Sequence, residues 1–393
     1  MGAICSMSEV SRRAEPGRID RTSDLRRPTY SGWKSAPPGP DETQTQIAHQ
    51  FIVVSTIVRV LLDTNVWSRL ADRREGASLN RLVTNTAAEV VVSPASLLEV
   101  LSGPPRQSRQ ARIRLMARNR WIRLPTEARV ESEELIGEIR RLRPAWSRFA
   151  EPSLTYRNYE RFWAQEVWER ARREQFERPV HIRDAHRSDE DAITRTQRSM
   201  QREFRNSGEA SSVEALAKWL TNVTALPETS DAEAAAEGWT LGVPSEPWRY
   251  ETLGTLWRAI NLQTGDNYGD RTYLDWLEPY VDVEQIRERR REFGQFLLYE
   301  VDSGRMVRNW LRWAVRFLQI AARIQLSNPR DEQLASYLPD ADLFLTTDKT
   351  FFRILKTVAQ TAPSPCATPH LLMPSSAEPI VDQIANALEQ CGI

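Results

Sequence analysis

Aspartates close two apolar runs that lie far apart in the chain. Asp63 directly follows the run 57–62, and Asp348 follows the run 341–345 after two threonines. A buried parallel strand with an acid at its carboxyl end is how open α/β sheets place active-site groups. Two such strands predict two carboxylates at one point, an arrangement suited to a divalent metal ion and phosphate chemistry.

Two further acids occupy comparable places. Glu99 lies in the helix expected after the apolar strand 89–93, and Asp331 lies in the first turn of the helix that begins at Asn328-Pro329. Asparagine is a good N-cap, and proline is favoured as the first helical residue. If the strands are parallel neighbours, all four carboxylates lie at one edge of the sheet.

Four converging carboxylates raise one another's pKa unless a cation is present. Mg²⁺ or Mn²⁺ suits an all-oxygen site and retains waters that can attack a phosphodiester. We therefore expect Asp63, Asp331 and Asp348 to bind the metal. Glu99 is expected to help bind it or to act on the attacking water.

Other polar residues accompany these acids. Asn65 and Thr346 are expected to contact substrate or to support the acids, although both types also form local turn hydrogen bonds. Asp340 and Asp342 precede the strand 341–345 or lie at its start, and we expect them to face solvent. The alternative for these two is a role as additional metal ligands.

A basic run follows the Glu99 helix. No acid lies between Ser102 and Leu124, and an RNA backbone would need such a patch beside an acidic site that repels phosphates. We expect RNA contacts from Arg112 and Arg118, whereas the alternative is a solvated helix face in an arginine-rich chain. Overall charge gives no support, because 53 basic residues balance 53 acidic ones. The run comprises Arg106, Arg109, Arg112, Arg114, Arg118, Arg120 and Arg123.

The pattern along the 393 residues predicts an α/β fold of three layers, α/β/α, with a mainly parallel central sheet. Residues 1–50 are polar and proline-rich, which predicts a disordered tail. Residues 51–145 and 305–393 form the two parts of the α/β domain. Residues 146–304 read as a long helical insertion that carries eight of the 13 tryptophans, and we expect these to be core residues.

Periodicity gives the expected elements. Strands are expected over 57–62, 89–93, 121–124, 341–345 and 371–373. The helices that matter most to the argument are expected over 126–142, 306–326, 350–358 and 378–388.

The acidic set resembles the PIN domain (PilT N-terminus) family of metal-dependent ribonucleases. Asp63 with Asn65 two residues later resembles the first PIN motif, and the segment ending at Glu99 resembles the second. The helix of Asp331 resembles the third, and the Thr-x-Asp that ends at Asp348 resembles the fourth. The resemblance covers residues 57–145 and 305–393, and the long insertion departs from the small members of the family.

The resemblance implies a Mg²⁺- or Mn²⁺-dependent endoribonuclease, of the toxin type or an RNA-processing type. A toxin would have an antitoxin-like protein partner, and a homodimer is an open alternative. One rival is a haloacid-dehalogenase-like phosphatase with Asp63 as nucleophile, although Asn65 stands where that chemistry needs an acid. The other rival is a catalytically idle PIN-like scaffold that binds RNA or protein.

The expected cellular location follows from the absence of targeting and membrane-spanning signals in the sequence. We find no signal peptide and no apolar run long enough to cross a bilayer. Cys5, Cys366 and Cys391 have no paired spacing. We therefore expect a soluble cytoplasmic protein without a membrane partner.

Overall fold

The computed structural model describes most of the chain from residue 57 onward. The tail expected over residues 1–50 lies outside the described part. The described residues are 57–103, 106–148, 154–173, 198, 201–202, 212–261, 272–322, 328–373 and 377–391.

Five parallel strands form the central sheet in the order β3-β2-β1-β4-β5. In the central strand β1, Val60 lies opposite Val90 of β2, and Leu62 lies opposite Leu345 of β4. Apolar residues dominate these three strands because helices cover both faces of the sheet. Pro369 is tolerated because β5 is an edge strand. The bounds are β1 Val58–Leu62, β2 Ala88–Val92, β3 Ile122–Arg123, β4 Leu343–Thr346 and β5 Thr368–Leu371.

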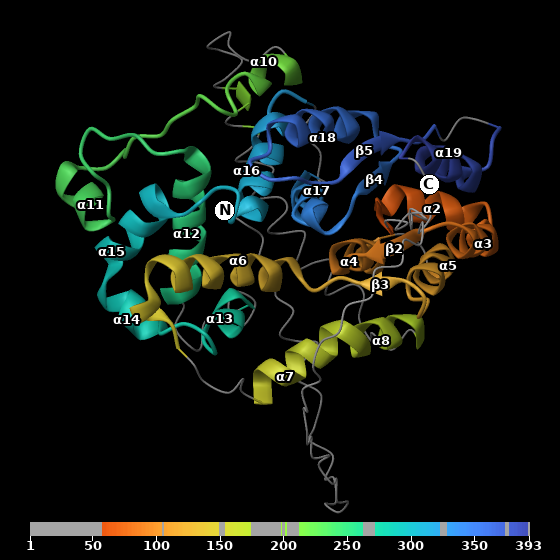
Figure 1. The fold of residues 1–393 in the computed structure, drawn as a ribbon, viewed down its shortest axis with the longest axis horizontal. Helices are drawn as coiled ribbons and strands as arrows, with labels where there is room; N and C mark the ends of the chain where they lie inside the picture. Colours follow the sequence, from red (N-terminus) through yellow and green to blue (C-terminus); the bar gives the residue numbers. More distant parts are fainter. Residues whose placement is uncertain are drawn as a thin grey trace, which may run out of the picture.

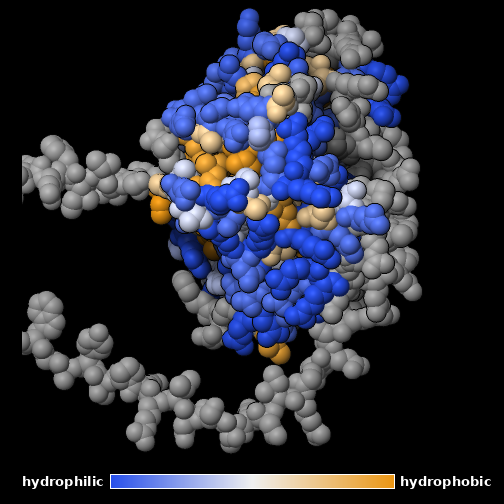
Figure 2. Space-filling view, turned by 90° about the vertical axis from the view of Figure 1, so that its right-hand side faces the viewer, coloured by the Kyte–Doolittle hydropathy of each residue, from blue (hydrophilic) through white to orange (hydrophobic). Residues whose placement is uncertain are grey.

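Helices lie on either side of the strands, which gives the three-layer α/β/α fold that the sequence predicts (Figure 1). The outer face of one layer is largely hydrophilic, with apolar residues visible near its middle (Figure 2). That layer holds α2 (Thr64–Asp72), α3 (Gly76–Asn85), α5 (Arg106–Met116) and α19 (Ile380–Gln390), and the other holds α4 (Pro94–Ser102), α17 (Asn328–Ala335) and α18 (Lys349–Thr361).

Between β3 and β4 every described regular element is helical, as predicted. Trp146, Trp168 and Trp248 are fully buried there, and they belong to the same hydrophobic cluster as the strands. The prediction that the tryptophans are mainly core is confirmed, with Trp219 exposed as an exception. The α-helices are α6 Glu127–Leu142, α7 Leu154–Arg161, α8 Val167–Arg173, α10 Val213–Ala217, α11 Asp231–Ala236, α12 Pro247–Asn261, α13 Thr272–Leu277, α14 Val283–Glu288, α15 Arg290–Gln295 and α16 Val307–Gln319.

Helix α16 is shorter than the expected span 306–326. After Gln319 the backbone bonds join each residue to the third one before it, as in Ile320 N–H to the carbonyl of Phe317 at 3.2 Å. This tighter winding is typical of a helix terminus. The apolar periodicity continues beyond the helix, and periodicity alone does not show where it ends. Among the described residues, no helix is long and apolar enough to span a membrane.

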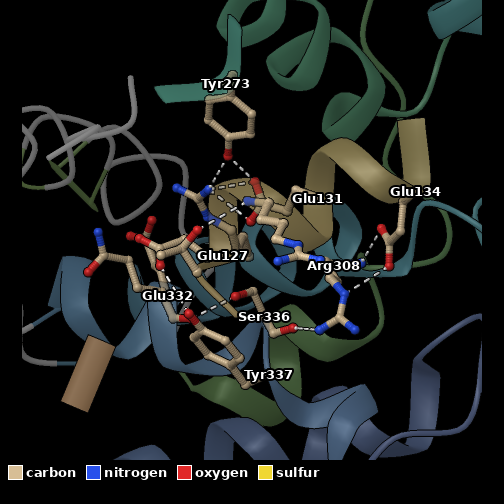
Figure 3. Close-up of polar contacts among 12 residues, drawn as sticks. Glu127, Glu131, Glu134, Tyr273, Arg308, Glu332, Ser336 and Tyr337 are labelled. Carbon is tan, nitrogen blue, oxygen red and sulfur yellow. Dashed lines mark hydrogen bonds and ion pairs between the residues drawn. The ribbon is translucent and has the colours of Figure 1, made fainter. Parts of the chain in front are cut away.

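A buried ion network joins α16 to α6 and α17 (Figure 3). Arginines at every fourth position of α16 each meet an acid on a neighbouring helix. Arg312 bonds Glu131 at 3.0 Å, Arg308 lies 3.2 Å from Glu134, and Arg316 bonds Glu332 at 2.8 Å. Tyr273 also donates its hydroxyl to Glu131. Removing one partner from such a network leaves a buried, uncompensated charge.

We predict that Arg312→Leu destabilises the fold by about 3–5 kcal/mol, because Glu131 would stay buried without its cation. Urea unfolding measures the loss. Arg305→Ala is the control, since Arg305 is largely exposed and should change stability by less than about 0.5 kcal/mol. Adding Glu131→Leu to the first variant should recover most of the loss. Equal urea concentrations at the unfolding midpoint for Arg312→Leu and the wild-type chain would contradict the prediction.

Candidate functional site

The pairing of β1 with β4 brings Asp63 and Asp348 to the same edge of the sheet. Asp63 follows β1, and its amide donates to the carbonyl of Leu345 in β4 at 2.9 Å. Asp348 follows β4 by two residues and caps α18, where Oδ1 accepts from the amides of Thr350 and Phe351 at 2.7 and 2.9 Å. Both acids therefore lie where a strand turns into a helix, as predicted.

Thr346 links these two acids. Its hydroxyl donates to Oδ2 of Asp63 at 2.6 Å and accepts from the amide of Asp348 at 3.0 Å. The side-chain amide of Asn65 donates to the same Oδ2 at 3.3 Å. Asp63 is almost fully buried, so these two donors hold one of its oxygens in a fixed orientation.

Asp331 and Glu99 complete the acidic group. Asp331 lies in the first turn of α17, and Glu99 lies on α4, which packs against α17. Burial raises the pKa of Asp331 well above its ordinary value, and the charges of Asp63, Glu99 and Asp348 raise it further. The structure thus brings the four predicted acids into one electrostatic neighbourhood.

The pKa of Asp63 is raised from 3.8 to about 6. Burial is the main cause and the charge of Glu99 adds to it, while the hydrogen bonds from Thr346 and Asn65 act in the opposite direction. Carboxylates, and no cationic side chain, are the charged groups that chiefly influence Asp63 and Asp331. Such a group favours proton uptake or a bound cation.

The donor set suits a hard divalent cation, because it consists of carboxylate oxygens. In the described part of the chain, however, no three acids, histidines or cysteines lie close enough to form a complete ligand set. Mg²⁺ commonly keeps several waters and takes only one or two carboxylates directly, so a hydrated ion does not require a complete set of protein ligands. In the residue after Asp63, the buried hydroxyl of Thr64 lacks a hydrogen-bond partner among the described residues.

The structure does not bring Arg112 and Arg118 to the acids. Arg112 lies 3.6 Å from Asp72 at the end of α2, and Arg118 donates to the carbonyl of Gly76 at 2.7 Å. Helix α2 starts directly after Asp63, so its far end lies roughly 13 Å away at 1.5 Å per residue. Their contact with RNA stays a prediction, and their observed contacts hold α5 against α2 and α3.

Asp340 and Asp342, the two acids near β4, were both expected to face solvent, and only Asp342 does. Asp342 is exposed and accepts from the amide of Arg59 at 2.8 Å. The prediction for Asp340 was wrong, because it forms two hydrogen bonds with Arg308 at 2.7 and 2.9 Å. Sequence position alone did not show that α16 would place a buried cation beside it.

Sequence reasoning missed Gln319 and the arginines of α16. Gln319 donates to the carbonyl of Asn328 at 3.1 Å and lies 3.4 Å from Oδ2 of Asp331, so it ties the start of α17 to α16. The signal was a polar stripe at helical spacing on an otherwise apolar helix, comprising Arg308, Arg312, Arg316 and Gln319. Such a stripe indicates buried polar partners on neighbouring helices.

Comparison of the chain with protein-family models, curated proteins and solved structures gives no match.

We predict that Asp63→Asn makes the protein more stable above pH 6. A raised pKa means that the contribution of Asp63 to stability is fully present below about pH 4 and is lost as pH rises through about 6. A permanently neutral side chain escapes this loss, which corresponds to about 2–3 kcal/mol at pH 8. Unfolding midpoints measured from pH 4 to pH 8 test it.

The control for this series is Glu389→Gln, which removes an exposed acid from α19. Its stability should follow the wild-type pH dependence. Glu99→Gln should give a smaller gain than Asp63→Asn, because it removes only one contributor to the raised pKa. A pH profile of Asp63→Asn that parallels the wild-type profile would show that Asp63 ionises without cost.

Proposed function

We propose that this protein is a PIN-like endoribonuclease that depends on Mg²⁺ or Mn²⁺. The observation that carries the proposal is the convergence of four carboxylates, two that follow β1 and β4 and two from helices α4 and α17, at one edge of a parallel sheet. Open parallel sheets bind ligands at this edge. Clustered carboxylates there suit metal-assisted attack on a phosphodiester.

The four acids and the two polar residues beside Asp63 have different proposed roles. Asp63, Asp331 and Asp348 would hold the cation, in part through its bound waters, and Glu99 would either help to hold it or accept a proton from the attacking water. Thr346 and Asn65 position Asp63 through the hydrogen bonds to Oδ2. When bound, the cation neutralises the acids and acts as a Lewis acid toward the phosphate.

The rival functions make different demands on the same residues. A haloacid-dehalogenase-like phosphatase would use Asp63 as nucleophile and an acid near Asn65 as proton donor. Asn65 instead directs its amide toward Asp63, which favours a positioning role. A catalytically idle PIN-like scaffold would bind RNA or protein without needing four buried or half-buried acids in a group.

The setting in the cell remains a proposal. We place the protein in the cytoplasm, where thiols such as Cys366 and Cys391 stay reduced. RNA is its proposed substrate, and an antitoxin-like partner or a homodimer would fit a toxin-type role. The helical part between β3 and β4 is proposed to limit or select the substrate.

We predict that the wild-type chain cleaves RNA with Mn²⁺ or Mg²⁺ and stops cleaving it in EDTA. Asp63→Asn, Asp331→Asn and Asp348→Asn should each lower the rate by about 100-fold or more, because each removes a charge that holds the cation. The rate of cleavage of single-stranded RNA and of structured RNA is measured by gel electrophoresis.

The matched control is Asp342→Asn, an exposed acid at the start of the same strand, whose activity should be within about twofold of wild type. Hydrolysis of a simple phosphate monoester without RNA cleavage would favour the phosphatase. Cleavage that survives both EDTA and Asp63→Asn would exclude the proposed metal nuclease.

We also predict that the metal stabilises the fold. Mg²⁺ or Mn²⁺ at 100 times its dissociation constant should add about 2.7 kcal/mol to the free energy of unfolding. Thermal unfolding at pH 8 measures this without any substrate. Asp63→Asn should lose most of the gain, and Asp342→Asn should keep it. An equal metal response in both variants would place the bound cation elsewhere.

A further inference from the structure

A groove lies between α6, α7 and α13, away from the acidic group. Its volume is about 520 Å³, within the range of about 300–1,000 Å³ that is typical of sites for small ligands. We call it the α6–α7–α13 groove. Its walls include Gly137, Tyr156, Trp276 and the arginines Arg129, Arg140 and Arg157, and the acids Glu133 and Glu160 also line it.

Aromatic rings form one part of the wall. Tyr156 packs edge to face against Trp276, with ring centroids 4.9 Å apart, and against Tyr280 at 5.8 Å. These mutual contacts fix the three rings. Tyr156 and Trp276 are buried, and Arg129 lies over the ring of Trp276 at 5.4 Å, so an aromatic ligand would meet only the small exposed part of a rigid surface. Aromatic side chains can bind a flat nucleobase whichever of the four bases it is.

The three arginines of the groove differ in their partners. Arg129 is paired with Glu133 at 2.8 Å and with Glu160 at 2.9 Å. Arg140 lies over the ring of Tyr280 at 5.5 Å, and Arg157 is exposed. Within the described part of the chain, neither Arg140 nor Arg157 forms an ion pair. The groove therefore offers guanidinium groups beside aromatic rings, a combination that suits an aromatic anion.

Gly137 leaves the groove open. It lies in the interior of α6 without a positive φ, and a Cβ there would meet nothing within 4 Å. Neither the backbone conformation nor the packing around residue 137 therefore requires glycine. Alanine at this position would stabilise the helix by about 0.5–1 kcal/mol. A larger side chain at this position would extend into the groove, so glycine keeps the space available.

We propose that the α6–α7–α13 groove binds one nucleotide, with its base against the aromatic rings and its phosphate on Arg140 and Arg157. The nucleotide is either a free 5′-monophosphate or one unit of a single-stranded RNA. The RNA source rests on the proposed ribonuclease function, whereas binding of the free nucleotide does not.

Helix α6 gives this groove a structural link to the acidic group. Arg129, Gly137 and Arg140 lie on the groove face of α6, while Glu131 lies on the face that bonds Arg312. The ion network continues along α16 to Arg316 and to the neighbour of Asp331. RNA held in the groove would thus be anchored on the same rigid helix that supports the acidic edge.

Binding is measured on the full chain carrying Asp63→Asn, in EDTA, so that no cleavage occurs. The probes are a fluorescently labelled single-stranded RNA and an equimolar mixture of the four 5′-monophosphates. Gly137→Phe should fill the groove, and Arg140→Glu with Arg157→Glu should remove its charge. We expect each change to weaken RNA binding by about tenfold, and the double charge reversal to lower its salt dependence.

Gly137→Ala and Arg291→Glu are the matched controls, because one changes only the helix and the other reverses an exposed arginine on α15. Both should bind within about twofold of the parent chain. Circular dichroism checks folding of Gly137→Phe, and the exposed arginine variants do not depend on that check.

Weakened RNA binding in the groove variants supports the RNA source. Weakened binding of the monophosphates with unchanged RNA binding supports the free nucleotide. Equal binding by the groove variants and the parent chain, or no binding of either probe, overturns the proposal. Because the metal is absent from this experiment, its outcome is independent of whether the chain cleaves RNA.

Discussion

The parallel pairing of β1 with β4 is the constraint on which the rest of the structure depends. It places residues that are 283 positions apart in hydrogen-bonding contact, as in the bond from Thr346 to Asp63. The last three residues of β1 and all four residues of β4 are buried and mostly apolar, so the register is set by hydrophobic burial as well as by backbone bonds. The carboxyl ends of the two strands then have to share one edge.

That edge carries an electrostatic cost, because burial and mutual repulsion raise the pKa of Asp63 and Asp331. The fold offsets part of the cost locally: Thr346 and Asn65 donate to Asp63, and the start of α18 donates to Asp348. The charged groups that chiefly act on Asp63 and Asp331 are other carboxylates, so these hydrogen bonds offset only part of the cost. A site that keeps such a cost is typical of function rather than of stability.

The helical part between β3 and β4 belongs to the same hydrophobic core as the sheet. Helix α6 is the element that joins the two. Its buried acids meet the arginines of α16, and its opposite face lines the groove with Tyr156 and Trp276. One helix thus carries both the buried ion pairs and a wall of the groove.

The sequence by itself determined the class of fold, because apolar strands ending in acids and helices starting at residues such as Ser93 are local patterns. It also indicated four site residues, since strand ends in a parallel sheet share an edge. Only the tertiary structure decided the partners of Arg118, Asp340 and Gln319, as well as the groove beside Gly137. Those contacts join segments distant in the chain, and a local pattern of residue types carries no information about which distant backbone or side chain will meet them.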